Sequence, residues 1–393
     1  MSIRRLPAIL LVLTAIGPAT VSAAEDATIT LLKPYEVATI SGASLSALRF
    51  AALARLNPVK PSIAGVDAQT LSLFGREDII AGASRDYLPN ACGQLPGGDQ
   101  PESEILRRAR ATSIVIINES HERSEHRGFT MRLLPGLREA GYTVLAMEAL
   151  ANPAPDQPAS FQPSFVRDPG LSYLEDGDGF YLGEAGFGRL GRAARALGYT
   201  FLPYEERDPS DVNLSVAEQI ARREEAQANS LAGWLRANPG RKLIVHVGYR
   251  HATEVPRLDS GRWMAARLKA KTGIDPLTVS QTTCRGGGRQ ARLAELPASE
   301  PQGAFDLVVD HPKARFVRGR PAWRFSAGDR PVTIPANLRP RQGWRVVEAR
   351  PEGQNTASIP IDRVAIRPGE DIALMLPPGR YRLRVIDLHK DRR

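Results

Sequence analysis

Acidic and imidazole side chains follow four apolar segments of this sequence. The first segment runs into Glu119 and His121, the second ends at Glu148, the third ends at Glu205, and the fourth runs into a Gly-x-x-His sequence that ends at His251. Carboxylates together with imidazoles can carry out general acid–base catalysis or bind a divalent metal ion. The candidate catalytic residues are Glu119, His121, Glu148 and His251.

Polar residues close to these positions are candidates for contacts with a substrate or a metal ion. The candidates for substrate binding are His126, Glu205, Tyr249 and Arg250. A divalent metal ion, if the protein binds one, would take His121, Glu148 and His251 as its ligands.

The segment from His121 to His126 comes close to two metalloprotease motifs and matches neither. HExxH requires its second histidine at position 125, and HxxEH requires a histidine at position 122, but both positions are glutamate. Residues five apart lie roughly 140° around a helix, so these two histidines would not share a helix face. We therefore expect His121 in a loop beside Glu119, and His126 one turn into the following helix.

Other histidines and charges have simpler structural interpretations. His246 lies inside the apolar segment 242–247, where a hydrogen-bonded core histidine is commoner than a ligand, and His311 and His389 are expected to be structural or solvated. The charged cluster 222–225 is typical of a solvated helix face with ion pairs three and four residues apart. The alternative is that Arg222 or Glu225 faces the site.

Alternating strand and helix patterns must position these groups. Apolar strands are predicted at 113–118, 143–148, 200–205, 242–247, 277–281 and 305–309, and helices at 43–56, 122–140, 187–197, 215–235 and 261–271. Such alternation indicates an α/β fold with a mostly parallel sheet flanked by helices. Ligands of such sheets bind beyond the carboxyl ends of the strands, which is where the candidate residues stand. Gly-Tyr-Thr precedes both the second and the third strand, either as a repeated βα unit or by chance.

The chain divides into three parts. Residues 1–24 are predicted to be a signal peptide, residues 25–312 an α/β domain with its core at 105–312, and residues 313–393 a small all-β appendix. The appendix is predicted because short alternating segments separated by Pro/Gly turns fill 331–388, as in a sandwich.

The first residues predict export. Arg4 and Arg5 precede an apolar run at 6–16 that is too short to span a bilayer, and small residues follow it. Cleavage near 23–25 would place the protein in the periplasm or outside the cell. No later segment is apolar enough for an integral membrane span. In an oxidising compartment Cys92 and Cys284 could pair, or they could be two unrelated buried thiols.

The basic composition does not indicate nucleic-acid binding. The 393 residues carry a net charge of +9, and removing Arg4 and Arg5 leaves 9 − 2 = +7. The basic residues are scattered, without the Lys/Arg tracts and interleaved aromatic residues that single strands require. At 42% hydrophobic residues, the chain has enough apolar material for a sizeable core.

The order of these motifs resembles the Tiki/ChaN/erythromycin-esterase-like superfamily. The matching stretches are INESHERSEHR (117–127), VLAMEAL (144–150), ARREEAQANSLAGWL (221–235) and VHVGYRHA (245–252). The resemblance covers roughly 105–312 and implies an α/β fold with Glu119, His121, Glu148 and His251 in its site. Asn118 stands where the first motif usually has glycine.

The resemblance implies three different chemistries. The Tiki branch consists of metal-dependent proteases, the erythromycin-esterase branch of hydrolases with a histidine base, and the ChaN branch of haem-binding lipoproteins. For the haem alternative, Tyr249 and Tyr181 would suit as ligands beside histidine.

The leading hypothesis is an exported hydrolase that cleaves an ester or amide bond of a small molecule or peptide, with or without a divalent metal ion. His251 or His121 would take a proton from water, and Glu119 and Glu148 would orient the imidazole, hold the water or ligate a divalent metal ion. The alternatives are a periplasmic haem- or metal-binding protein of the ChaN type, and an inactive scaffold whose β appendix binds a partner protein.

Overall fold

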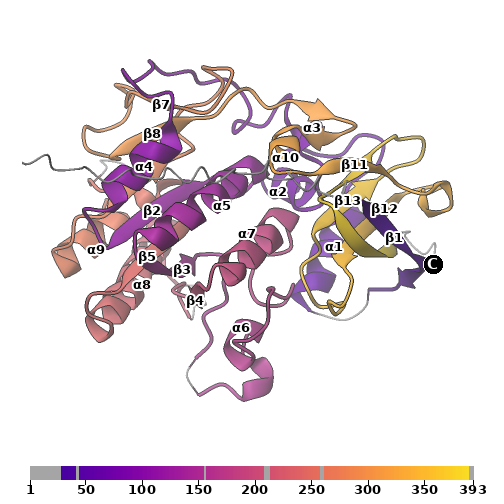
Figure 1. Cartoon of the computed structure of the whole chain (residues 1–393), viewed down its shortest axis with the longest axis horizontal. Coiled ribbons are helices and arrows are strands. Elements are labelled where there is room, and N and C mark those ends of the chain that lie inside the picture. The colour runs from indigo at the N-terminus through magenta and orange to yellow at the C-terminus, as the bar shows by residue number, and fades with distance from the viewer. Residues whose placement is uncertain (1–27, 41–43, 155, 208–212, 257–260, 389–393) are drawn as a thin grey trace, which may run out of the picture.

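A seven-stranded sheet forms the centre of the computed structural model, which describes residues 28–40, 44–154, 156–207, 213–256 and 261–388 (Figure 1). Only β7 runs antiparallel, against β8. The predicted α/β fold with a mostly parallel sheet is therefore confirmed. In spatial order the strands are β4 (Thr200–Leu202), β3 (Tyr142–Met147), β5 (Lys242–Gly248), β2 (Ile114–Glu119), β6 (Leu277–Ser280), β8 (Leu307–Asp310) and β7 (Arg292–Ala294).

Alternate residues of β2 join two different hydrophobic clusters, because successive side chains of a strand point to opposite faces. Val115 and Ile117 share one cluster with α4, α5 and α7, and Ile114 and Ile116 share another with α8 and α9. The bounds of these helices are α4 Pro101–Ala109, α5 Ser124–Glu139, α7 Ala185–Ala196, α8 Val216–Ala237 and α9 Met264–Thr272. A capping box of Ser215 with Glu218 begins α8.

The strand register brings the ends of β2, β3 and β5 level with one another. Glu119 lies opposite Gly248, and Met147 lies opposite His246. Groups that follow these three neighbouring strands therefore meet at one edge of the sheet. The two Gly-Tyr-Thr triplets lead into β3 and β4, which pair in parallel.

The β-rich part contains residues from both ends of the chain. Its four-stranded sheet has the order β1 (Ile29–Ala38), β15 (Gly379–Leu388), β12 (Trp344–Pro351) and β13 (Asp362–Ile366), and β1 runs parallel to β15 (Figure 1). The sequence placed Ile29–Ala38 in the α/β part, but this strand pairs with β15 of the β-rich part. The two strands are far apart in sequence, so nothing local in either one indicates that they pair.

Shorter elements complete the chain. Two small ladders join β11 (Arg330–Thr333) to β14 (Ala373–Leu376) and β9 (Phe316–Val317) to β10 (Arg320–Pro321). The remaining helices are α1 Leu45–Arg55, α2 Val66–Leu73, α3 Glu77–Ile80, α6 Ser164–Arg167, α10 Trp323–Ser326 and the 3₁₀ turns Ala159–Phe161, Tyr249–Ala252 and Ala336–Leu338.

Cys92 and Cys284 form a disulfide, with their Cα atoms 5.7 Å apart. This decides between the two alternatives that the sequence left open. The predicted signal peptide and His389 lie outside the described residues. Within the described part, none of the helices has the length and apolar character that a membrane span needs.

Candidate functional site

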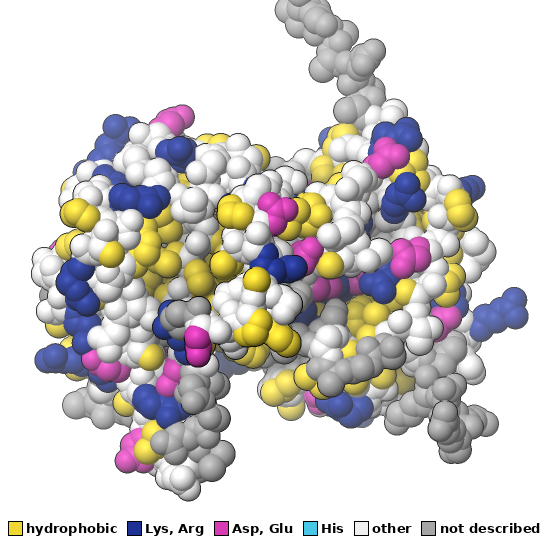
Figure 2. Space-filling view, turned by 90° about the horizontal axis from the view of Figure 1, so that it is seen from below, with side chains coloured by type: hydrophobic (Ala, Val, Ile, Leu, Met, Phe, Trp, Pro, Cys, Tyr) yellow, Lys and Arg dark blue, Asp and Glu magenta, His cyan; other side chains and the backbone are white. Residues whose placement is uncertain are grey.

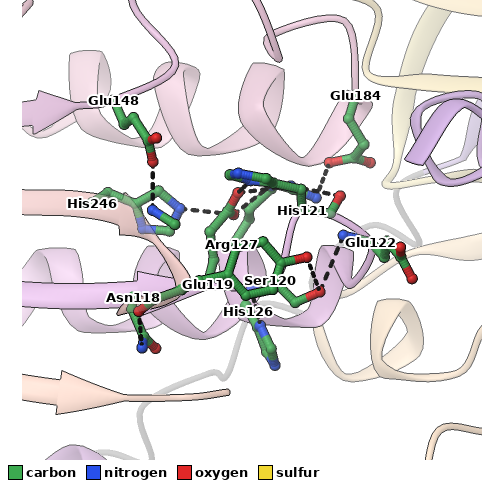
Figure 3. A network of polar contacts seen from close by, with 12 residues as sticks. Asn118, Glu119, Ser120, His121, Glu122, His126, Arg127, Glu148, Glu184 and His246 are labelled. Atoms are coloured by element: carbon green, nitrogen blue, oxygen red, sulfur yellow. Dashed lines mark hydrogen bonds and ion pairs between the residues drawn. The ribbon is translucent and has the colours of Figure 1, made fainter. Parts of the chain in front are cut away.

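Glu119, the last residue of β2, is a buried carboxylate shared by three side chains (Figure 3). Its Oε1 accepts a hydrogen bond from Nδ1 of His121 at 3.0 Å, and its Oε2 lies 3.0 Å from Nε2 of His246. Arg127 of α5 donates to Oε1 at 2.9 Å and brings its Nε within 2.8 Å of Oε2. Each oxygen of Glu119 thus fixes one imidazole.

The charge of Glu119 is stabilised by these neighbours. Burial favours the neutral acid, but the Arg127 charge and the hydrogen bonds from His121 and His246 outweigh it and hold the pKa of Glu119 well below its usual range. Arg127 is itself buried and also contacts Glu184 at 3.3 Å. The carboxylate is therefore ionised at neutral pH.

A second buried carboxylate, Glu148, follows β3. Its Oε2 accepts a hydrogen bond from the backbone N–H of Gly248 at 2.5 Å, and its Oε1 accepts one from the Arg223 guanidinium of α8. Burial opposes ionisation of Glu148, but the charges of His251, His121 and Arg223 lower its pKa to about 2. Arg223 also binds Glu205, which follows β4, so one guanidinium joins the ends of two strands.

His251 lies in the 3₁₀ turn after β5, between two carboxylates. Its Nδ1 is 2.6 Å from Oε1 of Glu224, and its Nε2 is 3.5 Å from Oε1 of Glu148. The other oxygen of Glu224 accepts the backbone N–H of Met264, which fixes that carboxylate at the start of α9. Burial disfavours protonation of His251, but the charges of Glu148 and Glu224 outweigh it and raise the pKa of His251 above its ordinary value.

The two imidazoles both lie close to Glu148. A Cβ atom placed on Gly248 would be 2.8 Å from Nε2 of His121 and 3.0 Å from Oε2 of Glu148, so these two groups approach each other across the glycine. Each histidine therefore has its Nδ1 against one buried carboxylate, Glu119 or Glu224, and its Nε2 on the Glu148 side. This arrangement suits a proton acceptor and a proton donor that act on one bound molecule.

Asn118 and Tyr249 shape the turn beside His121. Tyr249 has a left-handed backbone with φ 41°, an uncommon conformation for a residue with a side chain. The side-chain amide of Asn118 donates to the Tyr249 carbonyl at 2.6 Å, and the Tyr249 hydroxyl donates to Asp86 at 2.7 Å. The Tyr249 ring meets the His121 ring edge-on, with centroids 5.1 Å apart. The asparagine at the usual glycine position thus holds this turn together.

Two clefts border the site. One has a volume of about 520 Å³ and is lined by Glu148, Glu205, Tyr181 and the segment 151–180. The other, of about 780 Å³, is lined by His251, Tyr249, Arg250 and Trp263. Arg223 lines both clefts, and its side chain is 32% exposed. Both volumes fall in the range of small-molecule sites.

The structure brings together most of the residues that the sequence singled out. Glu119, His121, Glu148 and His251 meet at one sheet edge, and Glu205, Tyr249 and Arg250 border the clefts. His126 does not lie with them. Its ring is buried, its Nδ1 accepts the backbone N–H of Ser120 at 2.9 Å, and it packs against His311. The first turn of α5 directs the ring into the interior, away from both clefts, and its contact with a substrate stays a prediction.

The sequence pattern did not single out three residues that contact the site: Arg223, Glu224 and Arg127. The cluster 222–225 was interpreted as a solvated helix face, but Arg223 and Glu224 face the site, while Arg222 pairs with Glu206 and Glu225 pairs with Arg267. Arg127 was also missed. A stretch of four consecutive charges gives no signal of which two point inward. His246 is a partnered core histidine, as predicted, but one of its partners is Glu119.

The predicted metal ligands do not fit a metal ion in this arrangement. Within the described ranges, no three His, Cys, Asp or Glu side chains are arranged to ligate one ion. Both oxygens of Glu148 are already engaged, by Arg223 and by Gly248. Metal and haem binding stay predictions.

Comparison with known proteins assigns no family. No protein-family model matches the sequence, and no curated protein is similar to it. Among solved structures, the type III effector HopBA1 is 13% identical, with 58% of this chain and 99% of that chain covered and a TM-score of 0.34. RRSP, a MARTX toxin effector domain from Vibrio vulnificus, is 17% identical, with 54% of this chain and 43% of that chain covered and a TM-score of 0.33.

A third solved structure is the C-terminal region of Pasteurella multocida toxin, described as having a thiol-protease-like catalytic triad. It is 13% identical, with 55% of this chain and 30% of that chain covered and a TM-score of 0.32. This chain thus spans less than half the length of that chain and of the RRSP chain. Similarity at these TM-scores assigns neither a fold family nor an activity.

The close approach at Gly248 can be tested by adding one methyl group. The backbone of Gly248 has φ −77°, which any residue adopts, so Gly248→Ala acts only through contact with His121 and Glu148. We expect the free energy of unfolding in denaturant to fall by about 1–3 kcal/mol, because neither neighbour can move without breaking its hydrogen bond.

The matched control for this substitution is Gly233→Ala on α8, where the nearest atom to the added methyl is 4.0 Å away. It should be neutral or stabilise the protein by up to about 1 kcal/mol, since alanine favours helix. Equal unfolding free energies for the Gly248→Ala and Gly233→Ala variants would contradict the described packing.

Proposed function

We propose that this protein is an exported hydrolase that cleaves an ester or amide bond with water as the nucleophile. The observation that carries the proposal is the pair of histidines around Glu148, each with its Nδ1 against a buried carboxylate, at the border of two clefts. The resemblance of the motifs to the Tiki/ChaN/erythromycin-esterase-like superfamily supports it. The architecture proposed with it is a parallel sheet flanked by helices, with a small all-β appendix.

His251 is the proposed general base. It borders the larger cleft, and the contact of its Nδ1 with Glu224 directs its Nε2 toward Glu148 and Arg223. Nε2 takes a proton from water while the water oxygen forms a bond with the carbonyl carbon. The negative charge of Glu224 then stabilises the imidazolium, as a carboxylate does in a catalytic triad.

Arg223 and His251 complete the reaction. Arg223 lies between the clefts and can move from Glu205 toward the carbonyl oxygen, where its positive charge stabilises the oxyanion. The carbon–oxygen or carbon–nitrogen bond to the leaving group then breaks, and the imidazolium of His251 gives the leaving group the proton that it took from water. His251 thereby returns to its neutral form, and one water is consumed for each bond cleaved.

The disulfide between Cys92 and Cys284 supports the export part of the proposal, because such bonds persist in oxidising compartments. The substrate class remains a small molecule or peptide. A divalent metal ion at His121, Glu148 and His251 is not part of the proposed reaction.

Hydrolysis of 4-nitrophenyl esters and of fluorogenic peptide amides by the mature protein tests the proposed activity. His251→Ala should lower kcat/KM by about 10²- to 10⁴-fold, the usual contribution of a general base. Arg223→Met should also lower kcat, while Arg222→Met on the same helix, whose partner is Glu206, should not. Full activity of the His251→Ala variant would overturn the assignment.

The pH dependence of kcat/KM tests the role of Glu224. Because the base must be neutral, activity should rise with pH through the pKa of His251, which lies above 6.5. In Glu224→Gln the negative charge is gone, the pKa of His251 falls, and the rise should move to lower pH with a smaller maximum.

The matched control is Glu225→Gln, one residue along α8, whose carboxylate pairs with Arg267 and Lys271 instead. Its pH profile should match that of the unmodified protein. If kcat/KM of the Glu224→Gln variant rises at the same pH as that of the unmodified protein, Glu224 does not act through His251.

A further inference from the structure

An apolar groove lies next to the site, between α1, α2 and the segment that carries Phe180 and Tyr181. Its volume is about 240 Å³, and its apolar lining is Leu48, Ala52, Val66, Leu73, Phe74, Phe180 and Tyr181. The volume is below the roughly 300 Å³ of a complete small-molecule site, so it suits one part of a ligand.

Three of these side chains are unusually exposed for their type. Leu48 is 57% exposed, Val66 is 73% exposed and Phe180 is 53% exposed. Covering such surface stabilises a complex by about 25 cal/mol per Å² of apolar area. Figure 2 shows one face of the molecule, on which exposed hydrophobic side chains form patches among interspersed acidic and basic ones. A groove lined by exposed apolar side chains marks a place where a ligand can bind.

The groove is continuous with the site through two residues. Phe180 and Tyr181 line both the groove and the 520 Å³ cleft that contains Glu148. The Tyr181 ring stacks on the His121 ring, with centroids 4.5 Å apart and an interplanar angle of 20°. Tyr181 thus contacts His121 and also lines the groove.

The wall that carries Phe180 is held in place by two arginines, Arg49 and the buried Arg363. Arg49 of α1 donates to the carbonyls of Gly179 at 2.6 Å and Phe180 at 3.1 Å. Arg363 of β13 donates to the carbonyl of Gly183 and to Asp176. The groove is therefore preformed, which lowers the entropic cost of binding.

We infer that this groove is the subsite for an apolar chain of the substrate, so that the preferred substrates are esters or amides of medium-length fatty acyl groups. The inference rests on the proposed function for the reaction, but the groove itself can be tested by binding alone. The chain enters past Tyr181, which lines both the groove and the cleft, and the scissile bond lies at Arg223 and His251.

Two measurements with the mature protein test this inference. The first is the ratio of kcat/KM for 4-nitrophenyl octanoate to that for 4-nitrophenyl acetate. In Leu48→Gln/Val66→Thr this ratio should fall about tenfold, because polar groups replace apolar contacts with the chain. Val59→Thr replaces a valine that is 87% exposed outside the groove, and it should leave the ratio unchanged.

The second measurement is calorimetric binding of octanoate to the His251→Ala variant, with acetate as the comparison. We expect octanoate to bind more tightly than acetate, and the difference to disappear when Leu48→Gln/Val66→Thr is added. If neither ester is cleaved but this difference is found, the proposed function fails and the subsite stands. If the esters are cleaved with no effect of Leu48→Gln/Val66→Thr on the ratio, the subsite is wrong and the hydrolase stands.

Discussion

The shared carboxylate of Glu119 is the interaction on which the site depends. An ionised carboxylate in the interior is costly unless cations and hydrogen-bond donors surround it. Arg127 supplies the cation, and His121 and His246 supply the imidazoles. These contacts join β2, β5 and α5, so the position of the His121 ring depends on the packing of the sheet itself. Removing this carboxylate would leave the buried guanidinium with its ion pair to Glu184 and its hydrogen bond to the His121 carbonyl.

A second set of charges extends this arrangement toward the solvent. Arg223 and Glu224 are consecutive residues of α8, yet they place a cation beside Glu148 and a carboxylate beside His251. The β-rich part contributes from the other side, because Arg363 binds the segment that carries Tyr181. The site is therefore fixed by the central sheet, by one long helix, and by a part of the molecule that contains both ends of the described chain.

Most of the sheet and four of the site residues could be predicted from the sequence because they follow local rules. Apolar segments alternate with helical ones, and polar groups at the ends of neighbouring parallel strands must meet. Arg127 and Glu224 could not be predicted, because a charged residue on a helix gives the same pattern whether it faces solvent or a buried partner. The pairing of β1 with β15 joins distant segments, and no local pattern encodes it. The inward direction of His126 depends on where α5 begins, a boundary that patterns place only approximately.

The protonation of the two histidines is the most direct test of this account. Nitrogen-15 NMR of the imidazole rings, recorded above the pKa of His251, distinguishes the ring nitrogen that carries the proton. Because carboxylates only accept hydrogen bonds, Glu119 and Glu224 should hold the proton on Nδ1 of His121 and His251, leaving both Nε2 atoms unprotonated. We predict that both rings, those of His121 and His251, carry their proton on Nδ1. A proton on Nε2 of either ring would contradict the arrangement from which the proposed chemistry follows.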